Sequence, residues 1–154
     1  MTSESVEIET PQQSLSAHQF TQLFSATRRG ARLARLLAVE QLVAWGWPRG
    51  AERTDAAALV VAELAANAVT HGRLEGRGFR LGLVPLPTAR LRIEVTDPRG
   101  ERLLPAVLRE AVEGGRGLII VDALAADWGV RPYPPSGKTV WAEVSATPTG
   151  AGKI

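Results

Sequence analysis

A long apolar segment near the middle of the chain constrains its fold more than any other feature. Between residues 56 and 70 the only polar side chains are Glu63, Asn67 and Thr70, and alanine, leucine and valine fill the other positions. The segment predicts a helix, and a helix this apolar must be buried against other elements of a domain. Polar side chains on a buried helix need partners, because an unpaired buried polar group is costly.

The ends of this helix and the spacing of its polar residues define a candidate site. Thr54 is expected to cap the start of the helix, and Gly72 is expected to end it. Glu63, Asn67 and His71 are spaced four residues apart, so they fall along one side of a helix. A Mg²⁺ ion, or the polar edge of a ligand, would satisfy such a row. We expect only a packing or capping role for His71.

Length and composition favour a single domain in the cytoplasm. A chain of 154 residues is long enough for a hydrophobic core, and the absence of cysteine excludes disulfides and thiolate metal sites. No stretch is apolar over the length of a membrane helix. Residues 1–10 are acidic and polar, whereas a signal peptide is basic and then apolar. We therefore expect a cytoplasmic protein without a membrane partner.

Arginine dominates the basic residues without making the chain strongly charged. The formal net charge is only +2. Four arginines are close together, at Arg28, Arg29, Arg32 and Arg35. Such a cluster is compatible with a nucleic-acid patch, but no aromatic residues interleave with it, as stacking on single strands would require. A solvated helix face or a protein-docking surface is the favoured interpretation, and nucleic acid is not an expected partner.

Hydrophobic periodicity predicts a folded region between two polar ends. Residues 1–15 predict a disordered leader, residues 16–146 a single domain and residues 147–154 a flexible tail. Inside the domain the patterns predict a strand at 18–26, a helix at 28–45 capped by Thr27, the helix at 54–72, strands around 79–83 and 91–95, a short helix around 106–112, a helix at 117–126 and a strand at 138–145. This order favours an α+β fold, a two-layer sandwich in which helices cover one face of a mixed β-sheet.

Apolar spacing also predicts which side chains form the core. The first helix has a broad apolar stripe made of Ala31, Leu33, Ala34, Leu36, Leu37, Val39 and Leu42. The final strand alternates Val140, Ala142 and Val144 with Thr139, Trp141 and Glu143. Such alternation is typical of a strand with one buried face.

Two short motifs are candidates for nucleotide binding. Gly114-Gly115-Arg116-Gly117 leads directly into a predicted helix, where small residues let a phosphate approach backbone N–H groups and Arg116 can pair with the same anion. An ordinary glycine-rich helix entrance explains the same residues. Asp97 follows an apolar strand and precedes Pro98-Arg99-Gly100. Its carboxylate suits an adenine amino group, and a simple Asp-Pro turn is the alternative.

Two glycine motifs do not support common nucleotide-binding folds. Gly115-x-Gly117 lacks the third glycine of a dinucleotide fingerprint, because Ile120 stands there, and no strand precedes it. Gly137-Lys138-Thr139 matches the end of a phosphate-binding P-loop, but Pro132 stands where the first glycine is needed, and a strand pattern follows in place of a helix. The sequence predicts neither a Rossmann domain nor a P-loop NTPase.

In their order and spacing, these motifs resemble the GHKL ATP-binding fold of gyrase, heat-shock chaperones, histidine kinases and mismatch-repair ATPases. The matching motifs are Glu63-x-x-x-Asn67, Asp97-x-x-Gly100, Gly115-x-Gly117-Leu118 and Gly137-Lys138-Thr139. Within this fold the chain is most similar to the small anti-sigma regulatory factors with serine/threonine kinase activity, in the short stand-alone form found in actinobacteria. The resemblance covers residues 18–146.

The resemblance implies that the chain binds ATP and Mg²⁺, with a role for each matching position. Asn67 would be the metal ligand at the ATP phosphates. Glu63 would be the catalytic base that takes a proton from a hydroxyl of a partner protein. Asp97 would accept a hydrogen bond from the adenine amino group, and Thr139 would lie near the adenine through its hydroxyl or a water molecule.

The glycines and Arg116 complete the implied nucleotide-binding set. Gly100 would line the base pocket, and Gly115, Arg116 and Gly117 would form the phosphate loop. One motif departs from the family pattern: kinase members carry Asp-x-Gly-x-Gly after the strand, whereas this chain has a single displaced glycine and a stiff proline in 97–101.

Three functions follow from these observations. A serine/threonine kinase acting on an anti-sigma-factor antagonist, typically a small STAS-type protein, is favoured by Glu63 four residues before Asn67. A non-catalytic ATP-binding module that sequesters a sigma factor or another regulator is favoured by the altered motif at Asp97. Nucleic-acid binding through the arginine cluster is the third, and it predicts steep salt dependence. The family likeness also implies a homodimer.

Overall fold

The computed structural model describes residues 19–72, 78–97, 116–134 and 137–148. The helices and strands of these residues are β1 (Phe20–Ser25), α2 (Arg28–Ala44), α3 (Glu52–Gly72), β2 (Gly78–Leu86), β3 (Arg90–Asp97), α5 (Arg116–Leu124), β4 (Asp127–Tyr133) and β5 (Gly137–Ser145). The predicted leader at 1–15, the predicted helix at 106–112 and most of the predicted tail lie outside the described residues.

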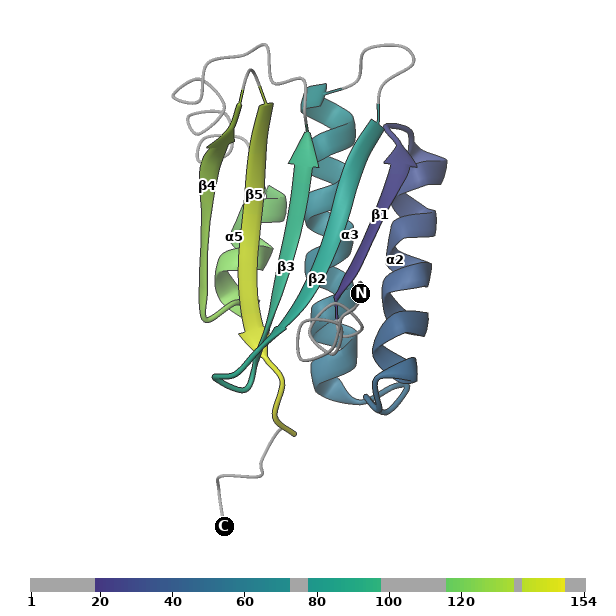
Figure 1. The fold of residues 1–154 in the computed structure, drawn as a ribbon, viewed down its shortest axis with the longest axis vertical. Coiled ribbons are helices and arrows are strands. Elements are labelled where there is room, and N and C mark those ends of the chain that lie inside the picture. Colours follow the sequence, from purple (N-terminus) through teal and green to yellow (C-terminus); the bar gives the residue numbers. More distant parts are fainter. Residues whose placement is uncertain (1–18, 73–77, 98–115, 135–136, 149–154) are drawn as a thin grey trace, which may run out of the picture.

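The strands form one sheet, and the helices cover one of its faces (Figure 1). The order across the sheet is β1-β2-β3-β5-β4, and each pairing is antiparallel. α3 packs between α2 and α5 and against β2, β3 and β5. The predicted α+β two-layer sandwich is therefore confirmed, and its sheet is antiparallel in place of the mixed sheet expected.

Alternation along the central strands gives the sheet a buried face and an open face. Successive side chains of a strand point to opposite faces, so every second residue of β2, β3 and β5 meets the helices. The core residues on these strands are Phe79, Leu81, Leu83, Leu91, Ile93, Val95, Val140, Ala142 and Val144. Burial of this apolar surface is the main stabilising contribution to the fold.

The open face of the sheet carries charged side chains that are joined in ion pairs. Arg92 on β3 contacts Glu143 on β5, with 2.7 Å between Nη1 and Oε2, and Glu94 on its own strand, with 2.8 Å between Nε and Oε2. The guanidinium of Arg92 also lies 4.2 Å from the ring centroid of Trp141. Arg131 on β4 reaches Glu94 at 3.3 Å. These contacts link β3, β5 and β4 through their side chains, in addition to the backbone hydrogen bonds of the sheet.

The start and end of α2 agree with the sequence prediction. Thr27 caps the helix, and its hydroxyl oxygen accepts a hydrogen bond of 2.9 Å from the backbone N–H of Gly30. Beyond the C-cap at Trp45, the backbone of Gly46 has a φ of 98°, which glycine adopts without the steric cost that other residues meet.

The predicted apolar stripe of α2 is only partly buried. Ala34 and Leu42 are completely buried, as expected, and Ala38 is buried as well. Leu33 and Leu36 are 46% and 56% exposed, so their assignment to the core was wrong. The buried residues of α2 are Gly30, Ala34, Ala38 and Leu42, which are spaced four apart, so the buried stripe is narrower than the predicted one. The four clustered arginines, at 28, 29, 32 and 35, are all exposed, as a solvated helix face requires.

The predicted capping role of Thr54 is also wrong. α3 begins at Glu52, and Thr54 lies inside its first turn, where it is buried. The hydroxyl of Thr54 donates a hydrogen bond of 2.7 Å to the carbonyl oxygen of Pro48. This bond fastens the turn between α2 and α3, so a residue type that favours helix caps serves here as a tertiary contact.

The sequence analysis missed one strand. β4 pairs with β5 alone, at the edge of the sheet. It contains Gly129 and Pro132, two residue types that are depleted in strands, and its apolar positions are few. Proline is tolerated here because an edge strand leaves some of its N–H groups without a ladder partner.

Candidate functional site

The structure brings several of the predicted site elements to one end of the molecule. Figure 1 shows the end of α3, the end of β3 and the start of β5 at the same end of the sandwich, and the N-terminal end of α5 points toward it. The helix-covered side of this end therefore combines the polar residues of α3 with Asp97 and the first residues of β5.

Glu63 and Asn67 lie one helical turn apart on α3, as predicted. Both side chains are partly buried, in contrast to the fully buried Leu64 and Ala65 beside them. Within the described residues, neither side chain makes a hydrogen bond or an ion pair. A carboxylate and a carboxamide in this position can bind a ligand without first giving up contacts inside the protein. His71 lies in the last turn of the same helix.

Asp97, the last residue of β3, is buried on the helix-covered face of the sheet. It continues the phase of the core residues Ile93 and Val95, so its side chain points to the same side as theirs. Its Oδ2 atom lies 3.6 Å from the Nζ atom of Lys138, the residue directly opposite on β5. The Lys138 and Asp97 side chains are 8% and 5% exposed, so this is a buried ion pair.

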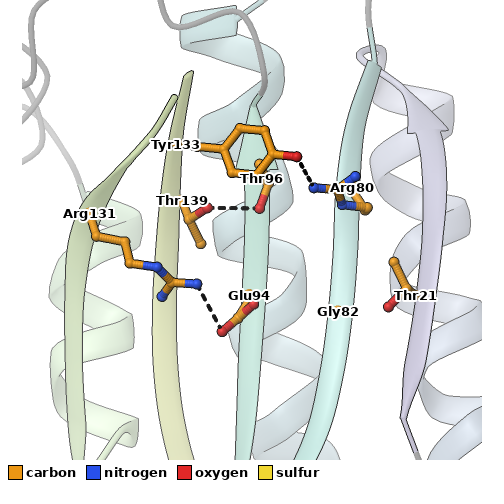
Figure 2. Close-up of a pocket in the computed structure, with 8 residues that line it drawn as sticks. All are labelled: Thr21, Arg80, Gly82, Glu94, Thr96, Arg131, Tyr133 and Thr139. Carbon is orange, nitrogen blue, oxygen red and sulfur yellow. Dashed lines mark hydrogen bonds and ion pairs between the residues drawn. The ribbon is translucent and has the colours of Figure 1, made fainter. Parts of the chain in front are cut away.

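The structure does not bring Thr139 to the side chain of Asp97. Thr139 pairs with Thr96 on β3, and the two hydroxyl oxygens are 2.8 Å apart. Both residues point to the open face of the sheet, where they line a cavity of about 110 Å³ (Figure 2). Thr139 and Asp97 therefore direct their side chains to different faces of the sheet, because adjacent positions of a strand point to opposite faces.

The cavity on the open face is lined mostly by residues with polar or charged side chains. Arg80 donates a hydrogen bond of 2.8 Å to the hydroxyl of Tyr133, and Arg131 pairs with Glu94 (Figure 2). The complete lining is Thr21, Arg80, Gly82, Glu94, Thr96, Arg131, Tyr133 and Thr139. Each charged group that lines the cavity is thus already paired with a neighbour.

Only some residues of the glycine motifs belong to the part of the chain that the structure describes. Gly100 and Gly115 lie outside the described residues. Arg116 and Gly117 are the first two residues of α5, so the glycine-rich motif does lead into a helix, as predicted. Gly137 and Lys138 open a strand, which agrees with the exclusion of a P-loop, since that motif requires a helix at this point.

Two features are absent from the described residues, a cluster of metal ligands and a membrane-spanning helix. No group of three or more histidine, cysteine, aspartate or glutamate side chains is arranged there to hold a metal ion. Nor does any helix in this part of the chain combine the length and apolarity needed to cross a membrane.

Lys138 is the buried residue of this site that the sequence analysis missed, although the sequence held a signal for it. The alternation of β5 places Val140, Ala142 and Val144 on the buried face, and Lys138 is in phase with them. Extending that alternation by one step puts Lys138, and not Thr139, on the buried face of β5.

Comparison with known proteins agrees with this architecture. The model of the histidine kinase-like ATPase domain family matches residues 24–144, which is most of the chain and all of α2, α3 and β2–β4. The chain belongs to the histidine kinase-like ATPase domain family. The resemblance to the GHKL ATP-binding fold is thereby confirmed.

Solved structures share the fold of this histidine kinase-like ATPase domain. The RsbU and RsbW domains of Rv1364c from Mycobacterium tuberculosis match with a TM-score of 0.61 and 18% identity, over 82% of this chain and 32% of that one. A chain in the crystal structure of the SiaB–SiaC complex from Pseudomonas aeruginosa matches with a TM-score of 0.63 and 11% identity, over 86% of this chain and 94% of that one. At these identities the likeness shows the fold alone.

A curated relative comes from an actinobacterium. An uncharacterized protein of Streptomyces coelicolor is 43% identical over 60 residues, which are 36% of this chain and 57% of that protein. The histidine kinase-like ATPase domain described here thus matches less than two thirds of that relative's length.

Proposed function

We propose that this histidine kinase-like ATPase domain is a regulatory protein of the anti-sigma-factor type, which binds ATP and transfers its γ-phosphate to a serine or threonine of an antagonist protein. One observation carries the proposal: Glu63 and Asn67 lie one turn apart on α3, partly buried and without a described partner. They do so in a chain that matches an ATPase family over residues 24–144.

The residues present fit a magnesium–ATP complex. Carboxamide oxygens are among the hard ligands that Mg²⁺ binds, and Mg²⁺ takes most of its other ligands from phosphates and water, so Asn67 suffices as the protein ligand. Mg²⁺ would neutralise the charge that builds up on the phosphates. Asp97 would accept a hydrogen bond from the adenine amino group, with Gly100 beside the base. Gly115, Arg116 and Gly117 would bind the phosphates at the start of α5, where backbone N–H groups favour anions.

Glu63 is the proposed catalytic base. A hydroxyl oxygen of the partner protein forms a bond to the γ-phosphorus, the bond from that phosphorus to the β–γ bridging oxygen breaks, and ADP leaves with that oxygen. The hydroxyl proton passes to the carboxylate of Glu63. Phosphoryl transfer of this kind depends chiefly on positioning and on neutralising charge, which suits a site with a single base and few other reactive groups.

The partner is proposed to be a STAS-type antagonist, a sigma factor, or both in turn, as in partner-switching pathways. The resemblance to anti-sigma regulatory factors supports this, and so does the fold shared with a structure that is itself a complex, SiaB with SiaC. A homodimer is part of the same proposal.

Two substitutions test the proposal. In Asn67→Ala the binding of a fluorescent ATP analogue should weaken roughly tenfold or more and lose its dependence on Mg²⁺, because the metal ligand is gone. In Glu63→Gln the binding should stay close to that of the wild type, while transfer of labelled phosphate to purified STAS-type proteins falls by about 10²–10⁴-fold, since the base is gone. Thr70→Val, an exposed position on the same helix, is the matched control for both.

A second candidate is a non-catalytic ATP-binding module that sequesters a sigma factor or another regulator. The buried Asp97–Lys138 ion pair favours it, because this pair engages the carboxylate that the adenine needs. The same experiment separates the two functions. If Glu63→Gln transferred phosphate as fast as the wild type, the proposed role of Glu63 would be wrong. ATP binding with no transfer to any STAS-type protein would support the non-catalytic module.

A further inference from the structure

We propose that Lys138 determines how tightly this site binds the adenine base, and that it does so by competing with the base for the carboxylate of Asp97. This inference rests on the proposed function, in which Asp97 accepts a hydrogen bond from the adenine amino group. The inference adds to that site a residue, Lys138, that opposes nucleotide binding.

The register of the sheet fixes Lys138 beside Asp97. The two residues are directly opposite one another at the ends of β3 and β5, both on the helix-covered face. Their neighbours in phase, Val95 and Val140, are buried core residues. With 3.6 Å between Nζ and Oδ2 and both side chains more than nine-tenths buried, the ammonium and the carboxylate attract each other through a medium of low polarity.

A buried ion pair of this kind makes the carboxylate a poor partner for a neutral donor. The ammonium carries a full positive charge, whereas the amino group of adenine is neutral, and in a medium of low polarity two opposite charges attract each other more strongly than a charge and a neutral donor do. The base must therefore either displace Lys138 from Asp97, which breaks a buried ion pair, or share the carboxylate with a cation whose field repels the amino hydrogens. Both outcomes weaken the contact with the base.

The direction of the effect makes the inference distinctive. ATP is strongly negative, so removing a cation from its binding site ordinarily weakens binding. Competition by Lys138 predicts the opposite, because the loss of this cation removes a competitor for the carboxylate of Asp97. The gain must also depend on the 6-amino group of adenine, which is the group that uses the carboxylate.

The test compares wild type with Lys138→Met by calorimetric titration of the full chain, using MgATP and the triphosphate of purine riboside, which lacks the 6-amino group. Lys138→Met should bind ATP roughly tenfold or more tightly than the wild type, which is the size of effect expected when a hydrogen bond from the ligand to a charged group no longer has a competing cation. Its affinity for purine riboside triphosphate should not rise. Arg131→Met is the matched control, because it removes one cation from the neighbouring strand on the open face, and it should show no gain for either nucleotide.

Thermal unfolding provides a second measurement. Without nucleotide, Lys138→Met should unfold at a lower temperature than the wild type, because Asp97 loses a buried partner. Saturating MgATP should then raise its midpoint by more than that of the wild type. If Lys138→Met fails to fold, Lys138→Gln, which keeps a neutral donor beside Asp97, is judged by the same two nucleotides.

The possible results separate this inference from the proposed function. Weaker or unchanged ATP binding in Lys138→Met overturns the inference, and so does an equal gain for both nucleotides. If the wild type binds MgATP and Asn67→Ala does not, the proposed site stands whatever Lys138→Met shows. If neither the wild type nor the Lys138 variants bind ATP, the proposed function and the inference both fail.

Discussion

Gly30 lies where the first turn of α2 meets the end of β1. A Cβ atom at this position would overlap the backbone carbonyl oxygen of Ser25 and lie 2.7 Å from its hydroxyl oxygen. A side chain can often turn away from such an overlap, but backbone can move only if α2 shifts away from the sheet. The glycine is therefore required by close packing, in a helix where alanine would otherwise be preferred.

We expect Gly30→Ala to lower the free energy of unfolding by about 1–3 kcal/mol, as overpacked sites do. Helix propensity alone predicts the opposite sign, a gain of about 1 kcal/mol. Urea unfolding of the variant and the wild type decides between the two. Gly82→Ala is the control, because its nearest neighbour would lie at an ordinary 3.8 Å and the exchange should leave stability unchanged or raised. A more stable Gly30→Ala would show that α2 does not pack this closely on β1.

Single residues could be predicted from the sequence when their role depends on neighbours along the chain. Thr27 was identified as a cap because a cap bonds the next helical turn. Thr54 has the same residue type, but its hydroxyl bonds across a turn to Pro48, which no local pattern encodes. The pairing of Asp97 with Lys138 depends on the register between β3 and β5, and only the assembled sheet provides it.

At the scale of elements, an exposed ion pair between Arg49 and Glu40 links the connection between α2 and α3 to α2. Arg49, in the turn, donates two hydrogen bonds to Glu40 on α2, of 3.0 Å from Nη1 to Oε2 and 3.1 Å from Nη2 to Oε1. The side-chain hydrogen bond from Arg49, together with its charge, lowers the pKa of Glu40 below the ordinary value for glutamate. Both side chains are exposed, so salt screens the pair and its effect on stability is small.

The lowered pKa of Glu40 predicts the sign of a pH effect. A carboxyl whose pKa is lower in the folded state stabilises the fold at pH values above its unfolded pKa, and that contribution is lost as the pH falls through the folded pKa. We expect Arg49→Gln to return the pKa of Glu40 toward its ordinary value in a carboxyl titration followed by NMR. High salt should do the same in the wild type. An unchanged Glu40 titration in the variant would mean that the ion pair is absent in solution.

The elements themselves were predictable wherever apolar periodicity was strong. β2, β3, β5, α2 and α3 each present a buried side with the period of a strand or a helix, and each was identified with bounds close to those observed. β4 was not, because an edge strand buries little and is held mainly by its pairing with β5. Hydrogen bonds to β5 therefore define β4 as a strand, and its own sequence has too few apolar residues to indicate one.

At the scale of the whole molecule, the sheet depends on the strand that comes last among the described elements. β5 pairs with β3 on one side and with β4 on the other, and its residues Val140, Ala142 and Val144 belong to the core. Without β5 the sheet would separate into β1-β2-β3 and an isolated β4.

A chain that ends at residue 136 should therefore show no cooperative unfolding transition. It loses two of the four strand pairings and the core residues that β5 contributes. Chemical unfolding followed by circular dichroism measures this. A chain that ends at residue 148 keeps every described element and should unfold like the full chain. A sharp transition in the shorter chain would show that the first three strands and the helices form a domain on their own.

The central place of β5 also matters while the protein is being made. As the chain leaves the ribosome, β3 emerges with one edge unpaired and β4 emerges with no neighbour at all, and both wait for residues 137–145. Exposed strand edges beside apolar side chains are the surfaces on which nascent chains associate wrongly. The interval between the emergence of β4 and that of β5 is thus the period in which these edges are most exposed to wrong association, and slow codons before β5 would lengthen it.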